Sequence, residues 1–300
     1  MRYSFTSFDG KEISVLEWSD VASPKGIIQI SHGMAEHAGR YDAFAKKMNE
    51  HGYIVFADDH RAHGQTDPDT PGYCKGDIYG DTLKDMALLA KEYKKKYNLP
   101  VFLFSHSYGS FLGQRYIQES ADILSGAILG GSSYMKIFTT RLGAFLSGFA
   151  CAIGRGKKPS NTLKKASFDA YDKKFGGQSF ISSVPEECER YFNDKDCGFI
   201  CSNNFYNNFF KGVLKSYKKE NLANIDKNMP ILLMSGACDP VGEMGKGVEK
   251  LEKMYDSIGT NVKKVLYDGA RHEYLNDICR EEAYRDVAAF FDECLEKARG

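Results

Sequence analysis

Ser107 lies in a segment whose residue types and spacing fit a nucleophile held on a sharp strand-to-helix turn. The segment Phe104-Ser-His-Ser-Tyr-Gly-Ser110 follows an apolar run and precedes a helix-forming run. Such a turn strains its central residue, so the positions two before and two after must be small, and Ser105 and Gly109 meet this requirement. Free N–H groups at the start of the helix would stabilise negative charge beside the hydroxyl. A serine that only caps the helix is the alternative interpretation.

A nucleophilic serine needs a base and an acid, and residues of both types follow later predicted strands. Asp239 comes directly after the run 230–235, and His272 follows a run that ends near Tyr267. Taken singly, an Asp-Pro turn and a surface-loop histidine would explain them. Together with Ser107 they occupy the ends of three predicted strands in the order serine, acid, histidine, so we predict a catalytic triad. His272 would accept the serine proton, and Asp239 would orient the imidazole.

Backbone N–H groups are the candidates for the oxyanion site that an attacking serine requires. One belongs to Tyr108, directly after the nucleophile. The other belongs to the loop after the run 26–31, where His32-Gly-Met-Ala-Glu-His37 follows, and we assign it to Met34. Gly33 would let this backbone approach the substrate oxygen closely. We therefore predict that Met34 and Tyr108 stabilise the tetrahedral intermediate.

The elements that must position these residues alternate between apolar runs and helical patterns, which indicates a largely parallel sheet. A hairpin signal, Asp9-Gly10, joins the first two strands. Helices are predicted near 40–51, 81–97, 111–119 and 281–298. The predicted strands are 3–8, 12–18, 26–31, 53–57, 101–105, 126–130, 230–235 and 262–267.

The segment 131–222 interrupts this alternation and has a different composition. It contains several lysine pairs and the stretch 203–210, rich in asparagine and aromatic residues, without the alternation of a strand. We predict a helical insertion, or cap, over one edge of the sheet. The core would then consist of residues 1–130 and 223–300.

Composition and charge exclude several other classes of protein. Forty Lys and Arg balance forty Asp and Glu, so a nucleic acid is not expected as a partner. The first residues lack the apolar core of a secretory signal, and the apolar stretch 142–153 is shorter than the ~20 residues that cross a bilayer. We therefore expect a cytoplasmic protein without a membrane span.

Metal-ligand and disulfide patterns are missing from the sequence. The eight cysteines include no Cys-x-x-Cys pair. Among the seven histidines, His32 and His37 stand five apart on a predicted loop, and no His-x-x-x-His helix occurs. We predict no metal site, and we expect these histidines to brace the loops around the site through hydrogen bonds.

Five separated motifs, taken in order, resemble the monoacylglycerol lipase and lysophospholipase branch of the α/β-hydrolase superfamily. The resemblance extends from about residue 10 to the end of the chain. The motifs are His32-Gly-Met-Ala-Glu-His37, Asp59-His-Arg-Ala-His-Gly-Gln-Thr66, Ser105-His-Ser-Tyr-Gly109, Ser235-Gly-Ala-Cys-Asp-Pro-Val-Gly242 and Arg271-His-Glu273.

This resemblance implies a fold, an activity and a set of site residues. The implied fold is α/β, with a mostly parallel eight-stranded sheet, helices on both faces and a helical cap after the sixth strand. The implied reaction is hydrolysis of carboxylic esters without a cofactor. By position, the resemblance assigns the triad and the oxyanion donors to the same residues as above: Ser107, Asp239, His272, Met34 and Tyr108.

The chain departs from the family pattern at four positions near these motifs. Ser105 and Ser110 replace glycines, Ala62 replaces a loop glycine, and Tyr108 replaces a methionine. Serine is small enough for the first two positions, so we still expect activity. Tyr108 adds a phenol that either narrows the pocket or packs under the cap.

The cap is expected to select the substrate. We predict that Phe138, Phe145, Phe205 and Phe209 bind the acyl or aromatic part of the ester. The same apolar residues would allow transient contact with a membrane surface. Packing of the cap on its own core is the alternative interpretation.

The function that we favour is a serine esterase acting on a monoacylglycerol or lysophospholipid. An esterase of small or aromatic esters is an alternative, and so is a prolyl-aminopeptidase-type peptidase. The latter needs acidic cap residues, but residues 131–222 contain fifteen Lys and Arg against eight Asp and Glu. A non-catalytic binding protein is the third alternative, which the complete triad argues against. Ser107 disfavours an epoxide hydrolase or dehalogenase, since these use an aspartate nucleophile.

Overall fold

One twisted sheet of eight strands forms the centre of the protein. The computed structural model describes residues 1–120 and 122–299. The strand order is β1-β2-β4-β3-β5-β6-β7-β8, in which β2 pairs antiparallel with both β1 and β4, and the remaining neighbours are parallel. This is the predicted α/β fold. The strands are β1 (Arg2–Thr6), β2 (Glu12–Trp18), β3 (Gly26–Ser31), β4 (Tyr53–Asp58), β5 (Val101–His106), β6 (Leu124–Gly130), β7 (Ile231–Gly236) and β8 (Val262–Tyr267).

The central strands are buried throughout and mostly apolar because helices cover both faces of the sheet. Every residue of β3, β4, β5 and β7 is buried. Alternate side chains of β5 enter different cores, with Val101 and Leu103 on one face and Phe102 and Phe104 on the other. Near-continuous apolar runs are typical of such doubly covered strands, which explains why they could be recognised in the sequence.

Two groups of helices cover the faces. On one face lie α2 (Ile78–Tyr97), α3 (Tyr108–Glu119) and α10 (Lys246–Ser257). On the other lie α1 (Asp42–Glu50), which follows the short η1 (Ala38–Tyr41), and the long α11 (Arg280–Arg299). This arrangement leaves the carboxyl ends of the parallel strands open for the loops that follow them.

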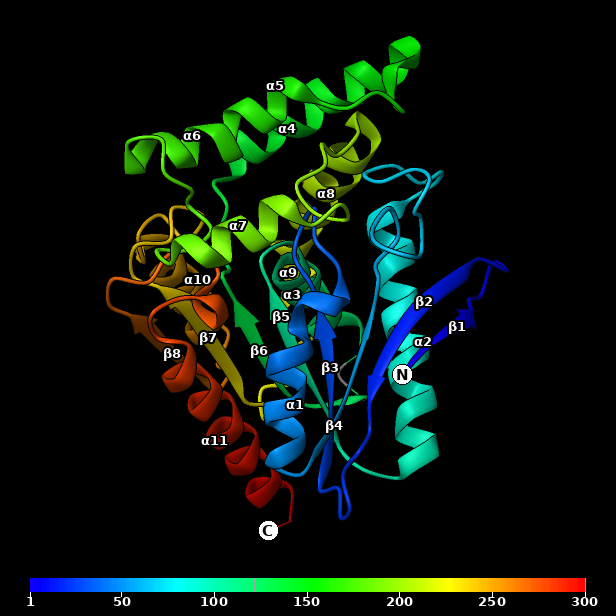
Figure 1. Ribbon diagram of the computed structural model, residues 1–300, viewed down its shortest axis with the longest axis vertical. Helices are drawn as coiled ribbons and strands as arrows, with labels where there is room; N and C mark the ends of the chain where they lie inside the picture. The colour runs from blue at the N-terminus through cyan, green and yellow to red at the C-terminus, as the bar shows by residue number, and fades with distance from the viewer. Residues whose placement is uncertain (121, 300) are drawn as a thin grey trace.

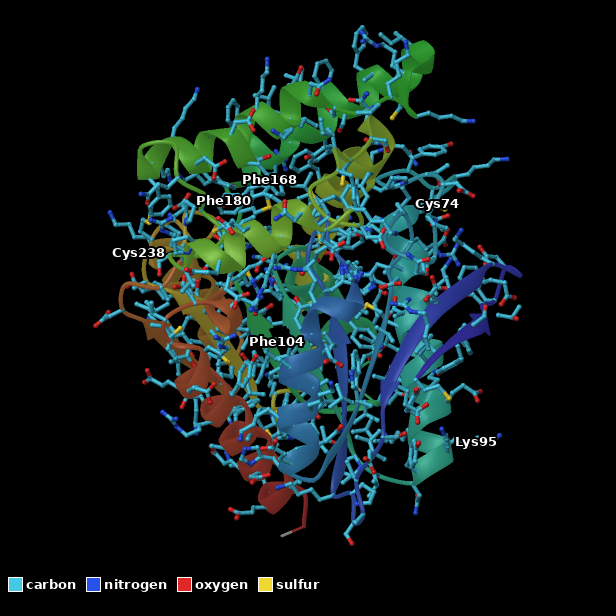
Figure 2. The ribbon with its side chains drawn as sticks, viewed as in Figure 1. Cys74, Lys95, Phe104, Phe168, Phe180 and Cys238 are labelled. Carbon is cyan, nitrogen blue, oxygen red and sulfur yellow. The ribbon has the colours of Figure 1, made fainter. Side chains whose placement is uncertain are left out.

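Between β6 and β7 the chain forms a series of helices, and we call residues 131–222 the cap. Figure 1 shows α4, α5 and α6 lying across the top of the molecule, above the carboxyl ends of the strands. In Figure 2, Phe168 and Phe180 lie in this upper part, well above Phe104 of the sheet. The cap elements are α4 (Ile137–Ala150), the π-helical η2 (Cys151–Arg155), α5 (Asn161–Ala166), α6 (Phe168–Asp172), η3 (Lys173–Phe175), α7 (Pro185–Asn193), α8 (Asn203–Ser216) and α9 (Lys219–Leu222).

The helix formed by α4 and η2 is longer than the apolar stretch on which the prediction of no membrane span was based. It runs from Ile137 to Arg155, and in the described part of the chain it is the one helix that is long and apolar enough to cross a membrane by length and composition. Its small residues face α8, where Gly143 lies against the ring of Phe210. One side of this helix is therefore packed within the cap, while its other side is exposed.

Candidate active site

Ser107 sits at the sharp turn between β5 and α3. Its backbone has φ 53° and ψ −120°, a strained conformation for a non-glycine residue. Gly109 is required here, because a Cβ atom at that position would lie 2.1 Å from the carbonyl oxygen of Ser31. Ser105 is accommodated at the position where the family has glycine, and its hydroxyl donates to the carbonyl of Ile128 at 2.6 Å. The elbow thus tolerates serine at this departure from the family pattern.

In the structure, the side chains of the three residues predicted as the triad are joined by hydrogen bonds through His272. The Ser107 hydroxyl lies 2.7 Å from Nε2 of His272, and Nδ1 of His272 lies 2.9 Å from Oδ2 of Asp239. Asp239 follows β7, and His272 follows β8, so all three side chains come from carboxyl ends of strands. The serine can therefore donate its proton to Nε2 of the imidazole, while the Asp239 carboxylate accepts a hydrogen bond from the N–H of the far ring nitrogen.

Asp239 is fully buried and held in one orientation. Oδ1 accepts the N–H of Val241 at 2.8 Å, and Oδ2 also accepts the hydroxyl of Ser235 at 3.2 Å. Burial by itself would raise the pKa of the Asp239 carboxyl, but the His272 ring and the Val241 N–H outweigh it and hold the pKa below its ordinary value. Asp239 therefore stays ionised at neutral pH and can stabilise a protonated imidazole.

Met34 and Tyr108, predicted as oxyanion donors, both line the cavity beside Ser107. Within the described part of the chain, neither of their backbone N–H groups donates a hydrogen bond to the protein. The N–H of Gly33 is already engaged by the carboxylate of Glu36. The two N–H groups beside Ser107 are thus available to a substrate oxygen.

An ion-pair bridge joins the loop of Met34 to the loop of His272, and sequence reasoning missed it. Arg40 donates to Glu36 at 2.7 Å and makes a two-pronged contact with Glu273 at 2.6 and 2.7 Å. Burial would raise the pKa of Glu36, but the Arg40 guanidinium outweighs it and lowers the pKa well below the ordinary value. A signal existed in the sequence, because both glutamates belong to motifs that also hold predicted site residues.

His106, directly before the nucleophile, is a further buried residue that sequence reasoning did not assign. Its Nε2 donates to the carbonyl of His272 at 3.1 Å, and its Nδ1 lies 3.8 Å from Glu36. Burial would lower the pKa of His106, but Glu36 outweighs it and raises the pKa. His106 therefore ties the nucleophile elbow to the backbone of the histidine loop.

A largely apolar cavity of about 450 Å³ opens above Ser107 and His272. Its walls combine the loops of the core with the cap. Among the described residues, no lysine or arginine lines it, and its two carboxylates are Glu36 and Glu273. The apolar and aromatic lining from the cap consists of Met135, Leu142, Leu146, Leu163, Ala166, Phe168, Tyr171, Phe180, Ile181, Tyr191, Tyr206, Phe209 and Phe210.

The structure places only one of the four predicted substrate-binding phenylalanines at this cavity. Phe209 lines it, whereas Phe205 is buried behind it, against the ring of Tyr108 at a centroid distance of 4.9 Å. Phe138 and Phe145 are 79 % and 69 % exposed and point away from it. Their prediction as pocket residues was wrong because the helical repeat turns a different face of α4 inward.

The inward face of α4 shows the 3.6-residue repeat that sequence reasoning did not apply to this helix. Thr139, Leu142, Gly143 and Leu146 follow one another at helical spacing and line the cavity. Both faces of the helix are apolar, so hydrophobicity alone could not distinguish them. The sequence left open whether the Tyr108 side chain narrows the pocket or packs under the cap. In the structure it does both, because it lines the cavity and packs against the phenylalanines of α8.

Buried histidines brace the loops around the site, as the sequence led us to expect. His60 contacts Asp58 at 2.7 Å and the hydroxyl of Ser31 at 2.8 Å. The backbone N–H of His60 donates to Nε2 of His32 at 3.0 Å, and the two rings stack. These contacts fix the loop after β4 against the loop that carries Met34.

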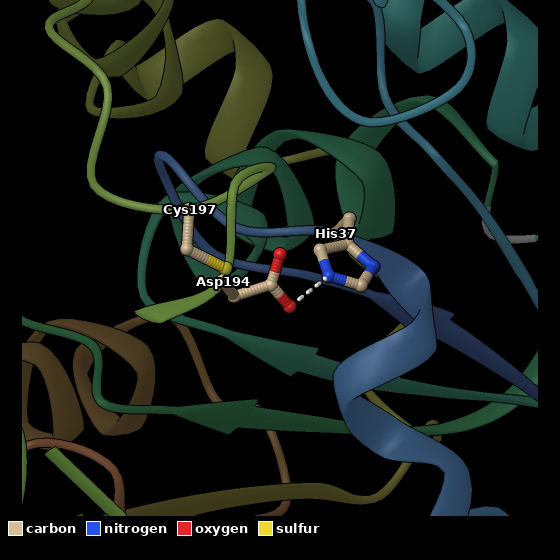
Figure 3. A group of neighbouring side chains, drawn as sticks. All are labelled: His37, Asp194 and Cys197. Atoms are coloured by element: carbon tan, nitrogen blue, oxygen red, sulfur yellow. Dashed lines mark hydrogen bonds and ion pairs between the residues drawn. The ribbon is translucent and has the colours of Figure 1, made fainter. Parts of the chain in front are cut away.

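One group of side chains in the described chain has the composition of a metal site. Figure 3 shows His37, Asp194 and Cys197 as neighbouring side chains. Their potential ligand atoms all lie within 4.8 Å of one another. Nε2 of His37 contacts Asp194 at 2.9 Å, while its Nδ1 accepts the N–H of Gly39 at 3.1 Å. Both ring nitrogens are therefore engaged in hydrogen bonds. The group forms a contact between core and cap that sequence spacing could not reveal.

The fold and the arrangement of Ser107, His272 and Asp239 define an α/β hydrolase. The family described as serine aminopeptidase, S33, matches residues 22–278. The chain therefore belongs to this family.

Individual relatives narrow the activity further. Monoglyceride lipase of Mus musculus is 25 % identical over 265 residues, which span 88 % of this chain and 80 % of the mouse protein. A thermostable carboxyl esterase from Bacillus coagulans, solved in complex with glycerol, has a TM-score of 0.90 and 28 % identity over 98 % of both chains. A monoglyceride lipase from Saccharomyces cerevisiae, 20 % identical, shares the fold with a TM-score of 0.79 over 97 % of this chain and 94 % of the yeast chain. The protein is thus an ester hydrolase.

Proposed function

We propose that this ester hydrolase is a serine enzyme that cleaves monoacylglycerols through an acyl-enzyme on Ser107. The observation that carries the proposal is the unbroken hydrogen-bonded chain from Asp239 through His272 to Ser107 on the floor of an apolar cavity. A chain of this kind activates a hydroxyl for attack on an ester carbonyl.

The proposed mechanism follows from the positions of the protons. Ser107 attacks the carbonyl carbon, and its proton passes to Nε2 of His272, while Asp239 stabilises the imidazolium. The carbonyl oxygen becomes an oxyanion that accepts the N–H groups of Met34 and Tyr108. His272 then protonates the leaving alcohol. A water then attacks the acyl carbon and gives a proton to His272; the bond from the acyl carbon to Ser107 Oγ breaks, the fatty acid leaves, and His272 returns the proton to Ser107.

The charges of the cavity favour a neutral alcohol over an anionic headgroup. A lysophospholipid brings a phosphate, yet the lining holds no lysine or arginine among the described residues. A peptidase of the aminopeptidase type would need a free carboxylate for the substrate ammonium. Glu36 and Glu273 are both paired with Arg40. Glycerol, which has only hydroxyl groups, fits this environment better than either of those alternatives.

The apolar cap residues support an acyl chain of medium or long length. A cavity of about 450 Å³ lies within the usual range of ligand sites, ~300–1,000 Å³. Each buried methylene contributes about 0.8 kcal/mol, so a chain that fills the cavity binds more tightly than an acetyl group. This separates the proposal from an esterase of small or aromatic esters.

The direct test is hydrolysis of 1-monoacylglycerols and p-nitrophenyl esters of increasing chain length by wild type and Ser107→Ala. We expect the rate to peak at medium or long chains and to vanish in the variant, whose fold is checked by circular dichroism. A peak at acetyl or butyryl would move the substrate to small esters. Preference for a lysophospholipid would contradict the assignment of a neutral alcohol.

We also propose that the outer face of α4 and η2 contacts a lipid surface during turnover. The exposed large apolar side chains that point away from the cavity are Phe138, Phe145, Phe149 and Ile153. A contiguous exposed apolar face is typical of a surface that contacts a membrane or another molecule. Phe145→Glu should weaken sedimentation with phosphatidylcholine vesicles and leave hydrolysis of a soluble short ester unchanged. Equal sedimentation of wild type and variant would contradict this contact.

A cytoplasmic location accompanies the proposal. All eight cysteines are free thiols, which is usual in a reducing compartment. Fractionation of cells that express the protein would test it, with recovery in a secreted fraction as the contradictory result.

A further inference from the structure

The cap contacts the loop of the predicted oxyanion hole through one carbonyl group. The carbonyl of Ala35, the residue directly after Met34, accepts the Tyr191 hydroxyl at 3.0 Å and the Gly198 N–H at 2.9 Å. Tyr191 belongs to α7, and Gly198 to the loop that follows it. A cap segment is therefore hydrogen-bonded to the core within one residue of a proposed oxyanion donor.

Ala35 needs such support because its backbone is strained. Its φ of 56° lies in the left-handed region, which a residue with a Cβ atom rarely adopts. Residues in this region persist only where their surroundings hold them. The core supplies one contact, from the Ala35 N–H to Nε2 of His63 at 3.2 Å. The cap supplies the two contacts to the carbonyl.

Tyr191 is placed to act on the loop from two sides. It is 4 % exposed, and the Arg40 guanidinium lies over its ring at 4.9 Å from the centroid. Arg40 in turn holds Glu36, whose carboxylate accepts the N–H of Gly33. The residues on either side of Met34 are thus both linked to Tyr191, Gly33 through the ion pair and Ala35 through the hydroxyl.

A second contact, next to Tyr191, also joins this cap segment to the core loop that carries Met34. Figure 3 shows His37 of the core pointing toward Asp194 of the cap, with Nε2 and Oδ2 2.9 Å apart. Asp194 lies between Tyr191 and Gly198 in sequence, and His37 follows Ala35 by two residues. The cap segment 191–198 consequently runs along the core loop 33–40.

We propose that Tyr191 is a positioning residue for the oxyanion hole. Its hydroxyl holds Ala35 in the left-handed conformation and thereby fixes the direction of the Met34 N–H. The cap then does more than enclose the substrate, because its docking on the core completes the site that stabilises the transition state. This inference rests on the proposed function, in which Ser107 attacks and Met34 receives the oxyanion.

The role predicts a particular kinetic signature. Interactions with the oxyanion exist in the transition state and not in the bound ester, so their loss lowers kcat and leaves KM almost unchanged. Removal of a whole oxyanion donor costs about 10²–10³ in kcat, and a misdirected donor should cost less. For Tyr191→Phe, which keeps the ring and removes the hydroxyl, we expect kcat to fall roughly tenfold.

The experiment compares Tyr191→Phe with wild type, Ser107→Ala and Tyr255→Phe. The last variant is a matched control, because it removes a buried hydroxyl without a hydrogen-bond partner from α10, away from the site. We expect the affinity for a trifluoromethyl ketone, which forms a tetrahedral adduct, to fall by the same factor as kcat/KM in Tyr191→Phe. Hydrogen exchange of the peptide 32–41 should become faster in that variant, whereas the elbow peptide 104–112 should not change.

The outcomes separate this inference from the proposed function. An active Ser107→Ala would overturn the proposed function. An inactive Ser107→Ala together with a wild-type kcat and analogue affinity in Tyr191→Phe would overturn the positioning role alone. A rise in KM at constant kcat would also overturn it, since Tyr191 would then act by touching the substrate.

Discussion

The carboxyl edge of the sheet and the cap both line the same cavity, but they are held in place by different kinds of contact. At the edge, backbone presses on backbone, as where Gly109 meets the carbonyl of Ser31. In the cap, backbone meets a side chain, as where Gly143 of α4 lies against the ring of Phe210 of α8. Backbone atoms in the sheet cannot move away from an added side chain, whereas an aromatic ring can rotate to make room for one. We therefore expect the edge to hold the reacting groups of the proposed mechanism and the cavity face of α4 to select the ester.

The largest expected effect is at the edge. Asp239→Asn keeps the size of the side chain but removes the charge that orients His272. A comparable change in a serine protease triad lowers kcat about 10⁴-fold, so we expect a loss of about 10³–10⁴ here, with little change in KM. Steady-state hydrolysis of a p-nitrophenyl ester measures it. A loss below tenfold would mean that Asp239 does not orient the base.

Matched glycine substitutions compare the two regions directly. Gly109→Ala should destabilise the protein by at least ~1–3 kcal/mol, the cost of overpacking, because its Cβ would meet backbone atoms. Gly143→Ala should cost less, because the Phe210 ring that it meets can move. Urea unfolding followed by circular dichroism gives both values. Equal losses would remove the distinction drawn between edge and cap.

Truncations on opposite faces of α4 test the role of the cap in selecting the acyl chain. Leu146 lines the cavity, and Phe145 faces solvent. Leu146→Ala removes contacts worth about 1–2 kcal/mol to a long chain, so kcat/KM for a long-chain ester should fall roughly 5–30-fold relative to acetate. Phe145→Ala should leave this ratio unchanged on soluble esters. A larger change for Phe145→Ala than for Leu146→Ala would contradict the assigned faces.

The smallest effect concerns pH and the bridge between the two catalytic loops. In the folded protein, the pKa of Glu36 lies well below the ordinary value of a glutamate, 4.5. Its contribution to stability is therefore fully present above about pH 4.5 and is lost as the pH falls through the folded pKa. Glu36→Gln should lose less stability than wild type between pH 5 and pH 3 in urea unfolding. If the free energy of unfolding fell equally with pH in wild type and in Glu36→Gln, the ion pair of Glu36 with Arg40 would not stabilise the fold.

The edge of the sheet was far easier to predict from the sequence than the cap. Strands such as β5 and β7 are buried on both faces, so their apolar runs stand out, and Ser107 and Asp239 follow these two strands. His272 follows the edge strand β8, which carries two lysines and is less buried. Parallel strands bring their carboxyl ends together. The meeting of these residues therefore followed from the order of elements.

The cap and the ion-pair bridge could not be predicted in the same way. Both faces of α4 are apolar, so composition did not show whether Phe145 or Leu146 turns toward the cavity. Arg40 and Glu273 are 233 residues apart, and Tyr191 meets Ala35 over 156 residues. Such contacts depend on how the cap docks on the core, which no local pattern records.

The central claim is that Ser107 carries the acyl group during turnover. Rapid mixing with p-nitrophenyl acetate, followed by acid quench and mass spectrometry of peptides, tests it most directly. The account predicts a burst of about one p-nitrophenolate per enzyme and an acetyl group on Ser107, with both absent in Ser107→Ala. An acetyl group on another residue, or an undiminished burst in the variant, would contradict it.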